Sequence, residues 1–253
     1  MLPLCTIHTW LNEIAPYHTA EDFDNVGLLI GNLSETVDNV VFCMDITTEI
    51  LTQALPLQNL LIVSHHPFIF HRISRIDTHS LQAKALRLLL ENNVQVIAMH
   101  TNWDKAKEGV SDALAHAFHL QEIIPLDDYL RMGTLQKPMT PEAFVAFVEE
   151  KLEAKACFYP AGQPLIQKVA VAGGAYGEGI QRAKEMGADA FVVGEIHHHQ
   201  LLEQENVTVV DAGHYATEAH GVRSLYHQFL TQMQQEKWAC HAHLMLQPPY
   251  QRR

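Results

Sequence analysis

Cysteine and basic side chains are scarce in this chain of 253 residues. The four cysteines, Cys5, Cys43, Cys157 and Cys240, are far apart and form no Cys-x-x-Cys, so a disulfide framework is not expected. Cys43 and Cys157 lie in strand-like contexts that favour buried thiols. Lys and Arg number 17 against 29 Asp and Glu, giving a net charge of −12. General nucleic-acid binding is therefore not expected, because neutralising phosphates requires clustered basic residues.

Long apolar runs are also missing. No stretch of 18 uninterrupted apolar residues occurs, and the first residues lack the basic and apolar regions of a signal peptide. We expect a soluble, cytoplasmic protein without a membrane segment. The glycine-rich stretch 173–179 lacks the Lys-Ser or Lys-Thr of a P-loop and the spacing of a dinucleotide fingerprint. A tight structural turn is favoured over a phosphate site there, and no organic cofactor is predicted.

Apolar strand patterns alternate with helical ones along the chain. Buried strands are predicted at 40–44, 60–63, 94–99, 168–172, 188–193 and 207–210, with a last strand at 240–246. Strands separated by helices of about ten or more residues predict an α/β fold with mixed, mostly parallel sheets. Residues 125–137 are the best candidate boundary. We expect two similar, intimately packed lobes within one unit of residues 1–253: about 1–124 plus a C-terminal return, and about 125–240.

Metal-type side chains follow three of these strands. His65 and His66 come after one strand, His100 and Asp104 after a second, and His214 with Glu218 after a third. Two adjacent histidines among the 17 in the chain are weak evidence alone. Ligands in open α/β sheets bind beyond the carboxyl ends of strands, so the three junctions together predict one shared site.

The number and type of these side chains suggest two metal ions rather than one. His214 and Glu218 are four residues apart, on one face of a first helical turn. Even with His100 set aside, three imidazoles and two carboxylates are too many ligands for a single catalytic zinc that keeps an open position. We predict His65, His66, Asp104, His214 and Glu218 as ligands of two divalent ions. The N and O donors fit Zn, Fe, Mn, Co or Ni and leave the choice among them open.

These motifs occur in an order that resembles a known family. Asp24-Asn25-Val26-Gly27-Leu28, Ser64-His65-His66-Pro67, His100-Thr101-Asn102-Trp103-Asp104, Gly194-Glu195 and Gly213-His214-Tyr215-Ala216-Thr217-Glu218 resemble those of the Nif-three-like proteins, or GTP cyclohydrolase 1 type 2 homologues. The chain is similar to the short bacterial members without an inserted domain. The resemblance implies the same five metal ligands, a two-lobed subunit with the dinuclear site between the lobes, and a homohexamer.

The family resemblance also implies a function. It suggests a metal-dependent hydrolase in which metal-bound hydroxide attacks a nucleotide or purine-type substrate. The alternatives are a metal-binding scaffold or regulatory protein without significant turnover, and a nucleotide phosphoesterase, which the same two-metal geometry permits.

Several polar residues have less certain roles. His100 is expected to act as a general acid or base beside the metals, or only to orient Asp104. Asp24 belongs either to the site or to a turn. Glu195 matches an acidic residue of the family. The three consecutive histidines at 197–199 are expected to face substrate, to bind metal adventitiously, or to begin a helix in solvent.

Overall fold

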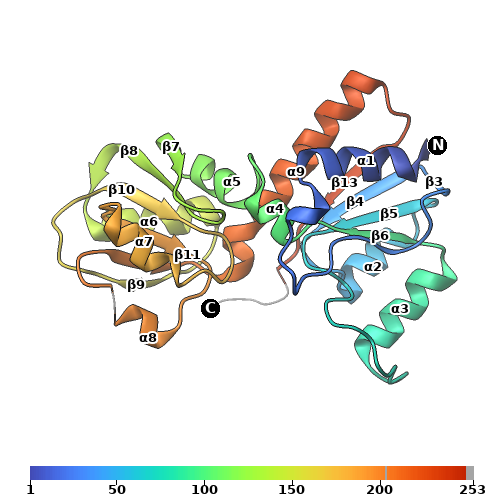
Figure 1. Cartoon of the computed structure of the whole chain (residues 1–253), viewed down its shortest axis with the longest axis horizontal. Coiled ribbons are helices and arrows are strands. Elements are labelled where there is room, and N and C mark those ends of the chain that lie inside the picture. Colours follow the sequence, from blue (N-terminus) through green and yellow to red (C-terminus); the bar gives the residue numbers. More distant parts are fainter. Residues whose placement is uncertain (203, 249–253) are drawn as a thin grey trace. The chain divides into compact units, whose positions relative to one another are not determined.

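The computed structural model describes residues 1–202 and 204–248, which form two compact units (Figure 1). The first comprises Met1–Trp103 and the segment that begins at Leu225; the second is Asp104–Ser224. The division differs from the expected boundary near residue 125. Helix α5 (Val110–Ala117) belongs to the second unit because its buried face packs in that unit's core, whereas the sequence pattern alone reads it as the continuation of the first sheet.

The first unit contains a mixed sheet of five strands. Strand order is β13 (His241–Met245), β4 (Asn39–Cys43), β5 (Leu60–Ser64), β6 (Gln95–Ala98) and β2 (Gly27–Ile30). The first four are parallel neighbours, and β2 runs antiparallel to β6. Strands β1 (Leu2–Pro3) and β3 (Thr36–Val37) form a separate antiparallel pair. The parallel arrangement places the carboxyl ends of β4, β5 and β6 side by side.

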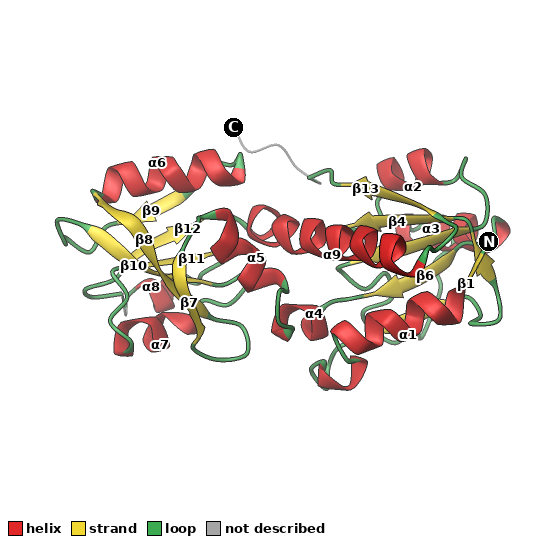
Figure 2. Cartoon of the chain, turned by 90° about the horizontal axis from the view of Figure 1, so that it is seen from above, coloured by secondary structure: helices red, strands yellow, loops and turns green. Residues whose placement is uncertain are grey.

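Helices cover both faces of this sheet (Figures 1 and 2). Helices α2 (Thr48–Ala54) and α3 (Leu81–Glu91) pack on one face through a cluster that includes Leu51, Leu89 and Val41. On the other face, Phe42 of β4 contacts Phe229 of α9 (His214–Glu236). The Phe229 ring also contacts Trp10 of α1 (Leu4–Ile14). All five residues of β5 are buried, as expected of a strand covered on both faces.

The second unit contains a mixed sheet of six strands. Strand order is β7 (Gln121–Pro125), β8 (Arg131–Met139), β10 (Ile166–Val171), β11 (Ala190–Val193), β12 (Thr208–Asp211) and β9 (Cys157–Tyr159). The central strands β10, β11 and β12 are parallel, and the outer pairings are antiparallel. Three carboxyl ends again lie next to one another.

This second sheet is also covered on both faces. Helices α5 and α6 (Pro141–Leu152) pack against one face in a cluster that includes Phe118, Phe144 and Val171. Helices α7 (Gly179–Glu185) and α8 (His198–Leu201) lie on the other, where Ile180 packs with Phe191. The predicted α/β class with mixed sheets is thus confirmed.

Two details differ from the sequence-based expectations. The stretch 125–137, expected to be a boundary, lies largely in the antiparallel pair β7 and β8, which joins the second sheet through β10. The turn between β7 and β8 carries Asp127 and Asp128, which give the stretch the polar composition of a linker. Cys157 is exposed, because it begins the edge strand β9, whereas Cys43 is buried. All four cysteines are free thiols.

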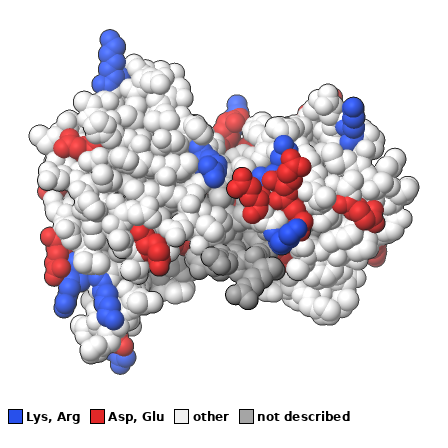
Figure 3. Space-filling view, turned by 180° about the vertical axis from the view of Figure 1, so that it is seen from behind, with Lys and Arg blue, Asp and Glu red and all other residues white. Residues whose placement is uncertain are grey.

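The charged surface is mixed. On the face shown in Figure 3, Lys and Arg side chains lie among Asp and Glu, with no continuous basic patch in the described part of that face. None of the helices among residues 1–202 and 204–248 is long and apolar enough to span a bilayer.

Candidate metal centre

Three histidines gather at the carboxyl edge of the first sheet. His65 and His66 directly follow β5, and His100 follows β6 with one residue between. Backbone hydrogen bonds continue past the strand, from His65 N to the carbonyl oxygen of Cys43 and from His66 N to that of Met44, each 3.0 Å. Ring nitrogens of the three histidines all lie within 4.8 Å of one another. This is the spacing that ligands of a common ion require.

Each of these rings is held through its Nδ1 by an oxygen acceptor. The acceptor of His65 is the carbonyl oxygen of Met99 at 2.8 Å, and that of His66 is Oδ1 of Asp45 at 2.7 Å. Metal-ligating histidines commonly donate their second ring N–H to a carbonyl or carboxylate, which fixes the tautomer and ring orientation. The arrangement leaves Nε2 of both rings as the nitrogen that could bind a metal.

His100 is held by a carboxylate from a distant loop. Its Nδ1 lies 2.9 Å from Oδ1 of Asp24, whose other oxygen accepts hydrogen bonds from the backbone N and the hydroxyl of Thr101. Burial alone would raise the pKa of the Asp24 carboxyl, but the hydrogen bonds from His100 and Thr101 hold the pKa at about 2. Asp24 therefore stays charged and orients the His100 ring.

The second unit carries the other predicted ligands, which are His214 and Glu218 at the start of α9, directly after β12, and Asp104 in α4 (Thr101–Lys105). Nε2 of His214 lies 3.1 Å from Oε2 of Glu218, one helical turn on, and its Nδ1 lies 3.0 Å from Oε1 of Glu195. A carboxylate oxygen of Asp104 lies within 4.8 Å of one of Glu218. Glu218 is buried, with 4% of its surface exposed. A buried carboxylate is costly unless a cation or hydrogen bonds compensate it, so this set suits a metal ion.

Glycines leave the space that the Glu218 carboxylate occupies. A Cβ at Gly174 would clash with Oε1 of Glu218, and a Cβ at Gly194 would clash with the hydroxyl of Thr217. Gly174 also has a positive φ of 63°. The glycine stretch after β10 is thus a tight turn against a candidate ligand, as the sequence favoured.

Thr217 ties this turn to the start of α9. Its buried hydroxyl accepts a hydrogen bond from the backbone N of Gly174 at 3.1 Å and lies 3.0 Å from the carbonyl oxygen of Gly213 and 2.9 Å from that of His214. One hydroxyl therefore connects the glycine turn to the segment that carries the candidate ligand His214.

Residues 4–247 match the family described as Duf34/NIF3 (NGG1p interacting factor 3). The chain belongs to the Duf34/NIF3 family. A protein of Streptomyces coelicolor named GTP cyclohydrolase 1 type 2 homolog is 31% identical over 231 residues, covering 85% of this chain and 81% of the relative. One of the same name from Clostridium acetobutylicum is 29% identical, covering 85% and 84%.

Solved structures of similar fold agree with this membership. A hypothetical protein of Staphylococcus aureus superposes with a TM-score of 0.91 at 25% identity, covering 100% of both chains. A Bacillus cereus protein related to NIF3 has a TM-score of 0.90 at 22% identity, covering 96% of both chains, and shows the fold alone.

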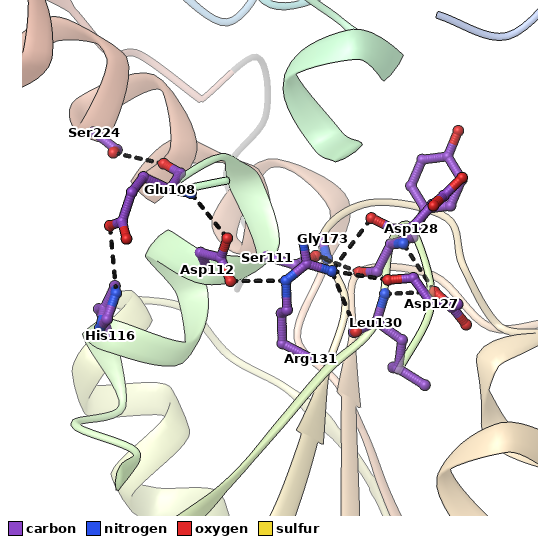
Figure 4. A network of polar contacts seen from close by, with 11 residues as sticks. Glu108, Ser111, Asp112, His116, Asp127, Asp128, Leu130, Arg131, Gly173 and Ser224 are labelled. Carbon is purple, nitrogen blue, oxygen red and sulfur yellow. Dashed lines mark hydrogen bonds and ion pairs between the residues drawn. The ribbon is translucent and has the colours of Figure 1, made fainter. Parts of the chain in front are cut away.

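An ion-pair network supports the glycine turn of this Duf34/NIF3 protein (Figure 4). The hydroxyl of Ser111 accepts a hydrogen bond from Gly173 N at 3.3 Å and donates one to the carbonyl oxygen of Tyr129 at 2.6 Å. Arg131, buried at 5% exposure, donates from Nε to Oδ1 of Asp112 at 2.7 Å and from Nη1 to carbonyl oxygens of the turn before it. The network fixes the helix and turn that contact Gly173.

Sequence reasoning found the candidate ligands but missed most of the groups that orient them. In the sequence Asp45 is only a polar residue shortly after a predicted strand, and the pattern around Asp24 fits a turn as well as a site. Glu195 was flagged, and the structure places its carboxylate on His214. His197 caps the short helix α8, and its ring stacks on that of His199. The described contacts therefore place this run at an exposed helix start.

Proposed function

We propose that this Duf34/NIF3 protein is a metal-dependent hydrolase that binds two divalent ions through His65, His66, Asp104, His214 and Glu218. One observation carries the proposal: the three proposed ligand histidines, and His100, each present an Nδ1 to an oxygen acceptor. That pattern fixes the orientation of each ring and leaves Nε2 for ligation or proton transfer, as is common in metal centres.

The two ions would lower the pKa of a water molecule and polarise the substrate. Residues of the chain supply the groups that transfer protons. Asp24 fixes the His100 ring with Nδ1 as hydrogen-bond donor, so Nε2 of His100 is the nitrogen that takes a proton from water or returns one to a leaving group. We assign His100 as the general acid or base.

The proposed substrate is a nucleotide or another purine-type molecule. Support comes from the relatives named GTP cyclohydrolase 1 type 2 homolog. In the cyclohydrolase reaction the five-membered ring of GTP opens and formate is released, whereas phosphoester hydrolysis releases phosphate. Product identification distinguishes the two.

The test combines metal analysis with a substrate screen. Elemental analysis of the purified protein should find two divalent ions per chain, and Asp104→Ala, His65→Ala and His214→Ala should each lower that content. His197→Ala, a change at a histidine outside the ligand set, is the matched control and should keep both ions. Because we propose a single dinuclear centre, loss of any one ligand should weaken the binding of both ions.

The activity arm measures formate and phosphate release from GTP and a panel of nucleotides. Hydrolysis that survives in Asp104→Ala with metal content intact contradicts the proposal. Metal binding without any turnover above the metal-free protein would instead assign the chain as a metal-binding scaffold. We further propose a cytoplasmic homohexamer, for which light scattering of the purified protein should give six times the chain mass of 28.5 kDa.

A further inference from the structure

An aromatic pair lies beside the three histidines of the first unit. The ring centroids of Phe23 and Phe70 are 6.3 Å apart, and Phe70 lies 6.0 Å from the ring of His100 at an interplanar angle of 81°. His100 is itself 5.6 Å from His66. The aromatic rings therefore form a continuous series that leads from the candidate ligands to Phe23.

The two rings of the pair are not fully buried, although their loops are anchored. Phe23 is 66% exposed and Phe70 is half-buried. The residues before Phe70 do pack inward, since Phe68 and Ile69 contact the core cluster. The side-chain amide of Asn25 donates a hydrogen bond to the carbonyl oxygen of Ile69 at 2.6 Å and ties the two loops together. The structure thus holds two aromatic rings in place without burying them.

A planar ring is the ligand that this surface suits. Exposed phenyl rings on fixed loops offer faces and edges for stacking at little conformational cost. After Phe70 the chain carries Arg72 and Arg75, both exposed, and no acidic residue before Asp77. This segment is locally positive in a chain of net charge −12, and it suits an anionic group on the same ligand.

We propose that Phe23 and Phe70 form the surface on which the heteroaromatic base of a nucleotide stacks, with its phosphates toward Arg72 and Arg75. This inference rests on the proposed function, whose substrate it describes. It assigns binding specificity to two residues outside the ligand set.

The experiment measures binding by calorimetry, separately from turnover. GTP, guanosine and inorganic triphosphate are titrated into metal-loaded wild type, Phe23→Ala, Phe70→Ala and the double variant. Loss of base stacking should weaken guanosine and GTP binding by roughly tenfold or more, with triphosphate binding unchanged. Phe23→Tyr and Phe70→Tyr should restore binding. Leu81→Ala, at a position 77% exposed in α3, is the control for loss of an exposed apolar side chain.

Metal content and thermal unfolding of each variant show whether a loss of affinity reflects a loss of fold. Equal guanosine affinity in wild type and double variant overturns the inference, as does absence of guanosine and GTP binding to wild type. If GTP binds through the pair but neither GTP nor any nucleotide of the panel is hydrolysed, the stacking surface stands and the hydrolase proposal fails. If GTP is hydrolysed and the variants bind it normally, the hydrolase stands and the stacking surface fails.

Discussion

Replacing Thr217 by valine removes one hydroxyl from the candidate metal centre with little change of shape. In the folded protein this hydroxyl is the acceptor for Gly174 N, a buried donor, and it lies within hydrogen-bond distance of two carbonyl oxygens at the start of α9. Thr217→Val leaves the Gly174 N–H buried without that acceptor. Such a loss costs about 1–3 kcal/mol of unfolding free energy.

The same substitution should weaken metal binding. Gly174 lies against the Glu218 carboxylate, so movement of the turn displaces a candidate ligand. Loss of groups that orient metal ligands typically lowers affinity about 10–100-fold. The assay is competition for Zn²⁺ or Mn²⁺ with a chelating indicator, alongside urea unfolding of the metal-free protein. Thr217→Ser, which keeps the hydroxyl, should retain most of both properties.

Thr208 provides a matched control in the same unit. It is fully buried at the start of β12, the end opposite to the one that leads to His214, and its hydroxyl accepts a hydrogen bond from Ala161 N at 3.3 Å. Thr208→Val should lower stability by a smaller amount, because Ala161 is only half-buried, and should leave metal affinity unchanged. The reasoning is refuted if Thr217→Val and Thr208→Val have the same metal affinity, or if Thr217→Val is as stable as wild type.

Three further predictions follow from the polar groups near the site. The pKa of Asp24 is lowered to about 2 in the folded protein, so the ionised carboxylate contributes about 2 kcal/mol to the free energy of unfolding above the unfolded pKa near 4. This contribution is lost as the pH falls toward 2. In acid titrations the difference in stability between wild type and Asp24→Asn should therefore disappear between about pH 4 and pH 2. Gly174→Ala should displace the Glu218 carboxylate and lower metal affinity. Gly187 has a similar positive φ but open space around it, so Gly187→Ala should lower the free energy of unfolding by only about 1 kcal/mol and leave metal affinity unchanged. Unfolding and metal titration measure the two effects. Arg131→Met should lower the unfolding free energy by about 3–5 kcal/mol because it leaves the partner carboxylate of its ion pair uncompensated, and a stability equal to wild type would contradict that role.

Local structure followed closely from the sequence where short-range chemistry decides it. Thr47, Ser80 and Thr140, residue types that favour helix starts, each cap the helix that follows, and the side-chain oxygen accepts a hydrogen bond from the backbone N three residues on. Apolar runs marked the buried parallel strands because those strands are covered on both faces. The positions of His65 and His214 after such strands were readable for the same reason.

The sequence did not show which residues far apart in the chain contact one another. The partners that orient His66 and His100 come from 21 and 76 residues away, and a carboxylate after a strand looks the same in sequence whether or not a histidine faces it. The assignment of α5 to the second unit likewise depends on which sheet its apolar face packs against. Helical periodicity shows that such a face exists but not its partner.

The sequence by itself determined the fold class, the family and the set of candidate ligands, because strand and helix periodicity and metal-type side chains at strand ends are local patterns. Only the tertiary structure decided that Asp24, Asp45 and Glu195 hold the histidine rings, that Gly174 makes room for Glu218, and that Phe23 meets Phe70 beside His100. These contacts join segments that are distant in the chain, and packing of the sheets and loops brings them together.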